Sequence, residues 1–83
     1  MVNYSLIGTV VDLVTNWMEA RYGSAMSFNQ TYAGAMNWYE NTDITDPKEL
    51  ATCVIHYGVQ YKPVDYGEVK MLTDQYFNIN ERW

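Results

Sequence analysis

At 83 residues, of which 48% are hydrophobic, the chain has room for one small core, and so high an apolar fraction excludes a disordered protein because burial can offset the entropy lost on ordering. Ten acidic residues against five basic ones give a formal charge of −5, which opposes direct binding to the phosphates of a nucleic acid. The two Phe, eight Tyr and three Trp are more large aromatic side chains than such a core can enclose, so we expect several of them at a surface that meets a partner.

The first predicted element is a helix over residues 4–22, where apolar and polar residues separate cleanly at about 100° per residue. Its apolar arc is broad enough to be contacted from two sides, which makes this helix the predicted centre of the fold. Leu13 and Trp17 should then be deeply buried. Gly23 follows directly and predicts the end of the helix, because a left-handed C-cap is easy only for glycine.

A second helix is predicted over residues 28–40, because Ser27 and Gln30 have the spacing of a capping box. Its apolar stripe would consist of Phe28, Tyr32, Ala35, Met36 and Tyr39. Trp38 falls outside this stripe. It is therefore either packed by a loop or exposed and available to a partner.

The third helix has the strongest start signal, with Asp46 as N-cap, Pro47 at the first helical position and Glu49 placed to reach back to the cap. Its inner stripe would consist of Leu50, Cys53, Val54, Tyr57 and Tyr61, and its outer residues of Glu49, Thr52, His56 and Gln60. Two interpretations of its end stay open. Gly58 favours an end near Tyr57, whereas the alternation over residues 54–62 is also typical of a half-buried strand.

Pro63 predicts a break, because it forces Lys62 toward an extended backbone. A weaker helical pattern covers residues 65–79 through Val69, Leu72, Tyr76 and Ile79, with Met71 outside its stripe. Residues 78–83 show no periodicity, and the terminal Trp83 either folds back onto the core or reaches toward a partner.

No internal repeat or linker divides the sequence, so residues 1–83 are predicted to form one domain. The predicted fold class is all-α, with about four short helices around a central N-terminal helix. The alternative is an α+β fold with a strand or hairpin around residues 54–62.

No constellation of residues in the sequence indicates an enzyme. Cys53 and His56 would share a helix face, but zinc needs three or four ligands and the chain holds no other Cys or His. The Asp-rich segment lacks the ligand order of a calcium loop, and the glycines are too far apart for a phosphate loop. We therefore expect no catalytic residues, no metal site and no cofactor.

Cys53 is the only cysteine, which excludes an internal disulfide framework and favours a reducing compartment. The first helix carries Thr9, Asp12 and Thr15 within its apolar part, so neither a signal peptide nor a membrane span is predicted. We expect a cytoplasmic protein that does not contact a membrane.

An acidic run passes from the second predicted helix into the third, because Glu40, Asp43, Asp46 and Glu49 recur at every third position. If they lined one edge, they would imitate a row of phosphates for a protein that binds nucleic acid. The other interpretation is a solvated, cap-forming turn. With the aromatic pair beside the run, the predicted partner-binding residues are Trp38, Tyr39, Glu40, Asp43, Asp46 and Glu49.

A small, acidic, aromatic-rich domain without a catalytic set resembles the proteins with which phages and other mobile elements inhibit host machinery, including anti-CRISPR and anti-restriction proteins. The resemblance implies a non-enzymatic protein that occupies the binding surface of another protein, such as a nucleic-acid-handling or defence complex. A second interpretation is a self-associating structural or assembly protein, such as a small virion or scaffold component. Its aromatic surface would then join copies of the chain, in the simplest case as a homodimer.

Overall fold

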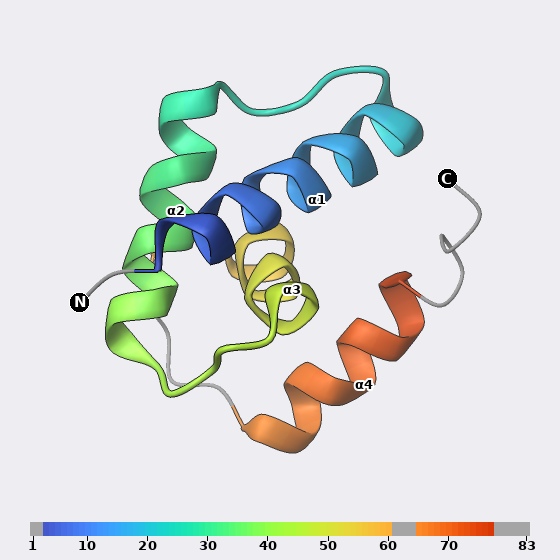
Figure 1. The fold of residues 1–83 in the computed structure, drawn as a ribbon. Helices are drawn as coiled ribbons and strands as arrows, with labels where there is room; N and C mark the ends of the chain where they lie inside the picture. Colours follow the sequence, from blue (N-terminus) through green and yellow to red (C-terminus); the bar gives the residue numbers. More distant parts are fainter. Residues whose placement is uncertain (1–2, 61–64, 78–83) are drawn as a thin grey trace.

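The computed structural model describes residues 3–60 and 65–77, which form four α-helices and no strand (Figure 1). The helices are α1 (Tyr4–Tyr22), α2 (Phe28–Asn41), α3 (Pro47–Tyr57) and α4 (Tyr66–Phe77). The all-α prediction with four short helices is confirmed for this part of the chain. The segment predicted as helix or strand is helical through Tyr57 and continues as a turn over residues 58–60. The expectations for residues 61–64 and 78–83 lie outside the described residues.

Local capping interactions set the ends of α1 and the start of α2. Gly23 has a left-handed φ of 77°, and its N–H donates to the carbonyl of Glu19 at 3.0 Å. The hydroxyl of Ser27 accepts a hydrogen bond from the N–H of Gln30 at 3.2 Å. Both signals were readable from the sequence, because a cap involves only residues that are neighbours along the chain.

The ends of α3 are also fixed locally. The Asp46 carboxylate accepts a hydrogen bond from the N–H of Glu49 at 3.1 Å, and Pro47 follows the cap as predicted. At the other end, Gly58 has a φ of 73° and its N–H donates to the carbonyl of Val54 at 2.9 Å. The interpretation in which the helix ends near Tyr57 is therefore confirmed.

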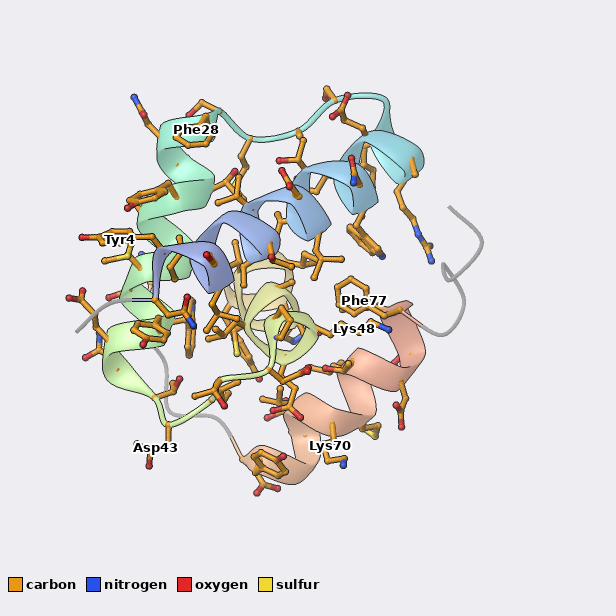
Figure 2. The ribbon with its side chains drawn as sticks, in the orientation of Figure 1. Tyr4, Phe28, Asp43, Lys48, Lys70 and Phe77 are labelled. Atoms are coloured by element: carbon orange, nitrogen blue, oxygen red, sulfur yellow. The ribbon has the colours of Figure 1, made fainter. Side chains whose placement is uncertain are left out.

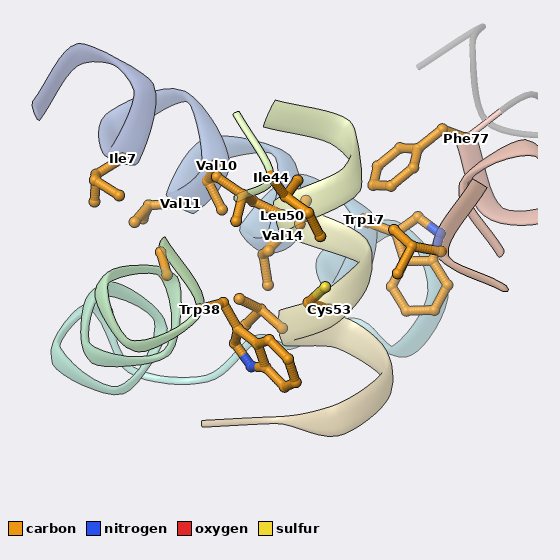
Figure 3. Close-up of a cluster of buried hydrophobic side chains, with 14 residues drawn as sticks. Ile7, Val10, Val11, Val14, Trp17, Trp38, Ile44, Leu50, Cys53 and Phe77 are labelled. Atoms are coloured by element: carbon orange, nitrogen blue, oxygen red, sulfur yellow. The ribbon is translucent and has the colours of Figure 1, made fainter. Parts of the chain in front are cut away.

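Among the described helices, α3 contacts all three others, and Figure 1 shows it end-on in the middle of the molecule. The central helix is therefore α3, and the prediction that the N-terminal helix α1 holds this place is wrong. α1 packs against α2 and α3, so it is contacted from two sides as its broad apolar arc predicts. Trp17 is buried as expected, whereas Leu13 is only half-buried, so the prediction of its deep burial is wrong. The core closes around side chains from every helix, among them Ile7, Val10, Val14, Trp38, Leu50, Cys53 and Phe77 (Figure 3).

The central position of α3 explains a wrong prediction about its faces. Six consecutive residues of this helix are buried: Glu49, Leu50, Ala51, Thr52, Cys53 and Val54. Glu49 and Thr52 were predicted to lie outside. A helix that is covered by three neighbours has little outer face left, so polar positions on it are enclosed as well. A buried polar group needs a hydrogen-bond partner, and the hydroxyl of Thr52 donates to the carbonyl of Lys48 at 2.9 Å.

α2 turns a different side to the core than its apolar pattern predicts. Its buried residues are Thr31, Gly34, Ala35 and Trp38. Three of these are small, and they let the end of α3 come close. A Cβ atom at Gly34 would lie 3.2 Å from Cγ1 of Val59 and 3.3 Å from Cγ1 of Val54. Phe28, which the pattern placed on the inner stripe, is instead 66% exposed.

Side chains of α2 hold the turn that follows α3. The indole N–H of Trp38 donates to the carbonyl of Gly58 at 2.8 Å, and the amide of Asn37 donates to the carbonyl of Val59 at 2.6 Å. The rings of Trp38 and Tyr57 lie 5.5 Å apart. This turn is thus fixed by residues that precede it by about twenty positions in the chain.

The backbone of α4 lies close to that of α3 alone among the described helices. Val69, Leu72 and Phe77 are its buried residues, and Met71 is exposed as its place outside the stripe predicts. The hydroxyls of Thr52 and Thr73 form a hydrogen bond of 3.0 Å between the two helices. None of the four described helices combines the length and the apolar character that crossing a membrane requires.

Candidate protein-binding surface

Two of the six predicted partner-binding residues are not on the surface. Trp38 has an exposed fraction of 0%, so of its two interpretations the packed one is confirmed, and its assignment as a partner-binding residue is wrong. Glu49 is 8% exposed in the first turn of α3, where it too is covered. Both errors have one cause: the side of α2 and α3 that faces the core was assigned from apolar residues, and packing between these helices selected another side.

The other predicted residues lie at the outside of the molecule. Glu40, Asp43 and Asp46 are exposed, and we call these three carboxylates the acidic edge. The edge begins in the last turn of α2, crosses the connector and ends at the N-cap of α3. Tyr39 is half-buried beside it and packs against the core. The structure thus brings four of the six predicted residues to one end of the α2–α3 unit.

The backbone of the connector is anchored in a way that leaves its acidic side chain outside. Ile44 is buried, and its N–H donates to the hydroxyl of Thr42 at 3.3 Å. The residues on either side, Asp43 and Thr45, are exposed. Asp46 has the structural role of a cap, as one of the two sequence-based interpretations proposed. Within the described part of the chain, Asp43 has no such bond, so its carboxylate is open to solvent.

The acidic edge contains no basic residue between its first and last carboxylates, and Lys48 follows two positions after Asp46. No Lys, Arg or His occurs between residues 23 and 47. The last turn of α2 contains no basic residue, and its end is covered by neutral groups, with Asn41 donating to the carbonyl of Asn37 and Thr42 to that of Trp38. The C-terminal end of a helix carries a negative partial charge, which adds to that of the carboxylates.

Figure 2 places Asp43, one carboxylate of the acidic edge, on the α2 side of the molecule. Phe28, Tyr4 and Asp43 lie along the α2 side of the view. Lys48 and Lys70 lie toward α4. The α2 side therefore presents the Asp43 carboxylate together with the aromatic rings of Tyr4 and Phe28.

The expectation that several aromatic residues lie at the surface is confirmed, although the residues differ from the predicted pair. The large apolar side chains that are most exposed are Tyr4, Tyr22, Phe28, Val59, Tyr66 and Met71. No local signal distinguishes these aromatics from the buried Trp17 and Trp38, because exposure depends on which helices meet.

A network of aromatic contacts that the sequence did not reveal connects the helices through their side chains. The ring of Tyr76 lies 5.3 Å from that of Trp17, and its hydroxyl is 3.3 Å from Nδ1 of His56. His56 in turn packs edge-on against Tyr57, with ring centroids 4.6 Å apart. Burial raises the pKa of the Tyr57 phenol to about 12, and its hydrogen bond to Glu68 acts in the same direction. These contacts give His56 a role in joining α3 to α4.

Cys53 and His56 do not form a common site. Cys53 is completely buried, whereas His56, about one turn further along α3, is exposed. The described residues contain no group of three His, Cys, Asp or Glu side chains that would hold a metal ion. Burial raises the pKa of the Cys53 thiol from 9.0 to about 12, and the nearby charge of Glu49 raises it further.

Cys53 should therefore be inert toward thiol reagents in the folded protein. The thiolate is the reactive form, and at neutral pH the raised pKa leaves almost none of it. Labelling by iodoacetamide should proceed only at the rate of unfolding and become fast in denaturant. The folded state favours the protonated thiol of Cys53, and ionisation of the thiol favours the unfolded state. The contribution of Cys53 to stability is therefore complete below pH 9.0 and is lost as the pH rises toward 12. Rapid labelling of the native protein would contradict the burial.

Comparison with protein-family profiles, with curated proteins and with solved structures gives no match for this chain. A functional assignment therefore depends on the surface itself. What that surface can do chemically is present fixed negative charge beside aromatic contact area, a combination suited to recognising a protein with a basic binding site.

Proposed function

We propose that this chain is a non-enzymatic inhibitor that binds another protein through the acidic edge and Tyr39. The observation that carries the proposal is the exposure of Glu40, Asp43 and Asp46 along one edge, within a stretch that contains no basic residue. The class of partner that fits this surface is a complex that handles nucleic acid, such as a host defence or restriction complex.

The expected binding site on such a partner is a basic groove. Proteins that bind nucleic acid place Lys and Arg side chains where they neutralise phosphates. Carboxylates spaced along an exposed edge would meet the same side chains and exclude the nucleic acid. Charges at the border of an interface mainly accelerate encounter, and a desolvated aromatic ring such as that of Tyr39 supplies contact area.

The proposal requires neither a cofactor nor a reacting group, since inhibition would follow from occupancy. The net charge of −5 also contributes, because it attracts a basic partner at long range and repels free nucleic acid. The phage or mobile-element origin of such an inhibitor is part of the proposal.

The test uses two variants with equal net charge. Glu40→Gln with Asp43→Asn neutralises the acidic edge, and Asp12→Asn with Glu19→Gln neutralises two exposed carboxylates on α1. A partner is first captured from the native host with the tagged wild-type chain. We expect association of the edge variant with that partner to slow by about tenfold and to depend less on salt, with dissociation nearly unchanged.

The α1 variant is the matched control, because it loses the same charge at a different place. It should associate almost as fast as wild type, and wild type should displace nucleic acid from the partner. Equal slowing in both variants would mean that net charge acts without a defined surface. Binding that leaves the nucleic acid in place would contradict inhibition by occupancy.

A further inference from the structure

One line of side chains runs along the outer side of α2, and its two middle residues also pack against the edge of the core. Phe28, Tyr32, Met36 and Glu40 are spaced four residues apart and so lie in one row on the helix. We call these four residues the α2 row. Phe28 is 66% exposed, Tyr32 and Met36 are half-buried, and Glu40 is exposed. The rings of Phe28 and Tyr32 stack with their centroids 5.8 Å apart, so the row begins as a preformed apolar ridge.

The distribution of charge along the row is asymmetric. Glu40 is the single charged residue of α2 and stands near its C-terminal end. The first turn contains no acidic residue, and its N-terminal end carries the positive partial charge of the helix. When two copies of the row are placed side by side in opposite directions, the negative end of each lies beside the positive end of the other. This complementarity exists although the chain as a whole carries a charge of −5.

We propose that the α2 row is an interface with a second copy of this chain, in which the two α2 helices pack antiparallel. The centre of the row lies between Tyr32 and Met36. Reversal about this centre brings Tyr32 of each copy to Met36 of the other, a favourable contact between an aromatic ring and a thioether. Rows of residues four apart pack into each other when helices cross at about 50°.

The two ends of the row decide between orientations. In the antiparallel arrangement, Glu40 of each copy lies beside Phe28 of the other and the positive end of its helix. In a parallel arrangement, the two Glu40 carboxylates would face each other, and like charges in an interface are costly. A twofold axis repeats each favourable contact, as in most homodimers.

A second copy fits this row better than a differently charged partner. Between Phe28 and Met36 the row has no charge, so a basic partner would find a single carboxylate at one end. Two copies of an acidic protein approach each other most easily over a surface free of like charges, and the row provides one from Phe28 to Met36. The acidic edge shares only Glu40 with the row, so Asp43 and Asp46 extend beyond the proposed contact.

The test is the oligomeric state of the isolated full chain, measured by analytical ultracentrifugation over a series of concentrations. We expect wild type to move from monomer to dimer as its concentration rises. Phe28→Glu places a carboxylate opposite Glu40 and should raise the dimer dissociation constant by about tenfold or more. Phe28→Lys removes the same ring but places a cation there, so it should dimerise more tightly than Phe28→Glu.

Tyr22→Glu is the matched control, because Tyr22 is 68% exposed on α1, outside the row. It should dimerise like wild type, and circular dichroism should show all variants folded, since Phe28 contributes little to the core. A monomeric wild type at every concentration would overturn the interface, as would a Tyr22→Glu variant that dissociates as readily as Phe28→Glu. Equal dissociation of Phe28→Glu and Phe28→Lys would overturn the antiparallel orientation.

Discussion

Replacing Trp38 with alanine should lower the free energy of unfolding by about 3–5 kcal/mol, a large share of the stability available to a domain of this size. Trp38 is completely buried and fills the space between α2 and α3. Its removal would leave a cavity and would release the carbonyl of Gly58 from the indole N–H. The measurement is the urea midpoint followed by circular dichroism, and a midpoint equal to that of wild type would contradict the structure.

A pair of milder substitutions separates the hydrogen bond from the ring. Trp38→Phe and Trp17→Phe remove the same atoms from two buried side chains. The indole N–H of Trp17 has no hydrogen-bond partner among the described residues, whereas that of Trp38 donates to Gly58 at 2.8 Å. Trp38→Phe should therefore cost about 1 kcal/mol more than Trp17→Phe. Equal losses would mean that the bond to Gly58 contributes nothing.

The contrast between these tryptophans and their predicted positions shows what the sequence can specify. Helix ends were predicted well, because the caps at Gly23, Ser27 and Asp46 are interactions between residues three or four apart. The choice of buried face was predicted well for α1, where apolar residues fill one broad arc. It failed for α2, because apolar residues occur on more than one side and only contact with α3 selects among them.

Burial on α2 follows from small residues as much as from large ones. Gly34 allows Val54 and Val59 to approach the helix, and Trp38 lies on the side so formed. Hydrophobicity alone gives such positions little weight, so the buried tryptophan was mistaken for an anchor at the surface. The same error places the exposed Phe28 inside. The positions of small residues, which let two helices approach closely, would have predicted the buried side of α2 better than the positions of apolar residues did.

The candidate surface was predictable only in its acidic part. Charged residues remain outside unless they are paired, which is why Glu40, Asp43 and Asp46 are found where the sequence suggested. Glu49 departs from this rule because it belongs to the first turn of α3, the helix that all three others cover. In this first turn, the carboxylate of Glu49 interacts favourably with the positive end of the helix dipole. Aromatic side chains follow no comparable rule, so their exposure depended on the packing.

Replacing Phe77 with alanine should have an effect of similar size, about 3–5 kcal/mol, but of a different kind. Phe77 is buried at the end of α4 and reaches the common core, as Figure 3 shows. The backbone of α4 lies close to α3 alone, so the loss of this ring should first release α4. We expect the amides of α4 to lose protection from hydrogen exchange before those of α1 and α3.

Met71→Ala is the control for this prediction, because Met71 belongs to the same helix and is 61% exposed. It should change the free energy of unfolding by no more than about 0.5 kcal/mol. Thr73 lies before the end of α4, so its hydrogen bond to Thr52 cannot hold that end in place of the Phe77 ring. Uniform loss of protection over all four helices in Phe77→Ala would show instead that α4 is as tightly integrated as the rest, and that the fold opens in one cooperative step.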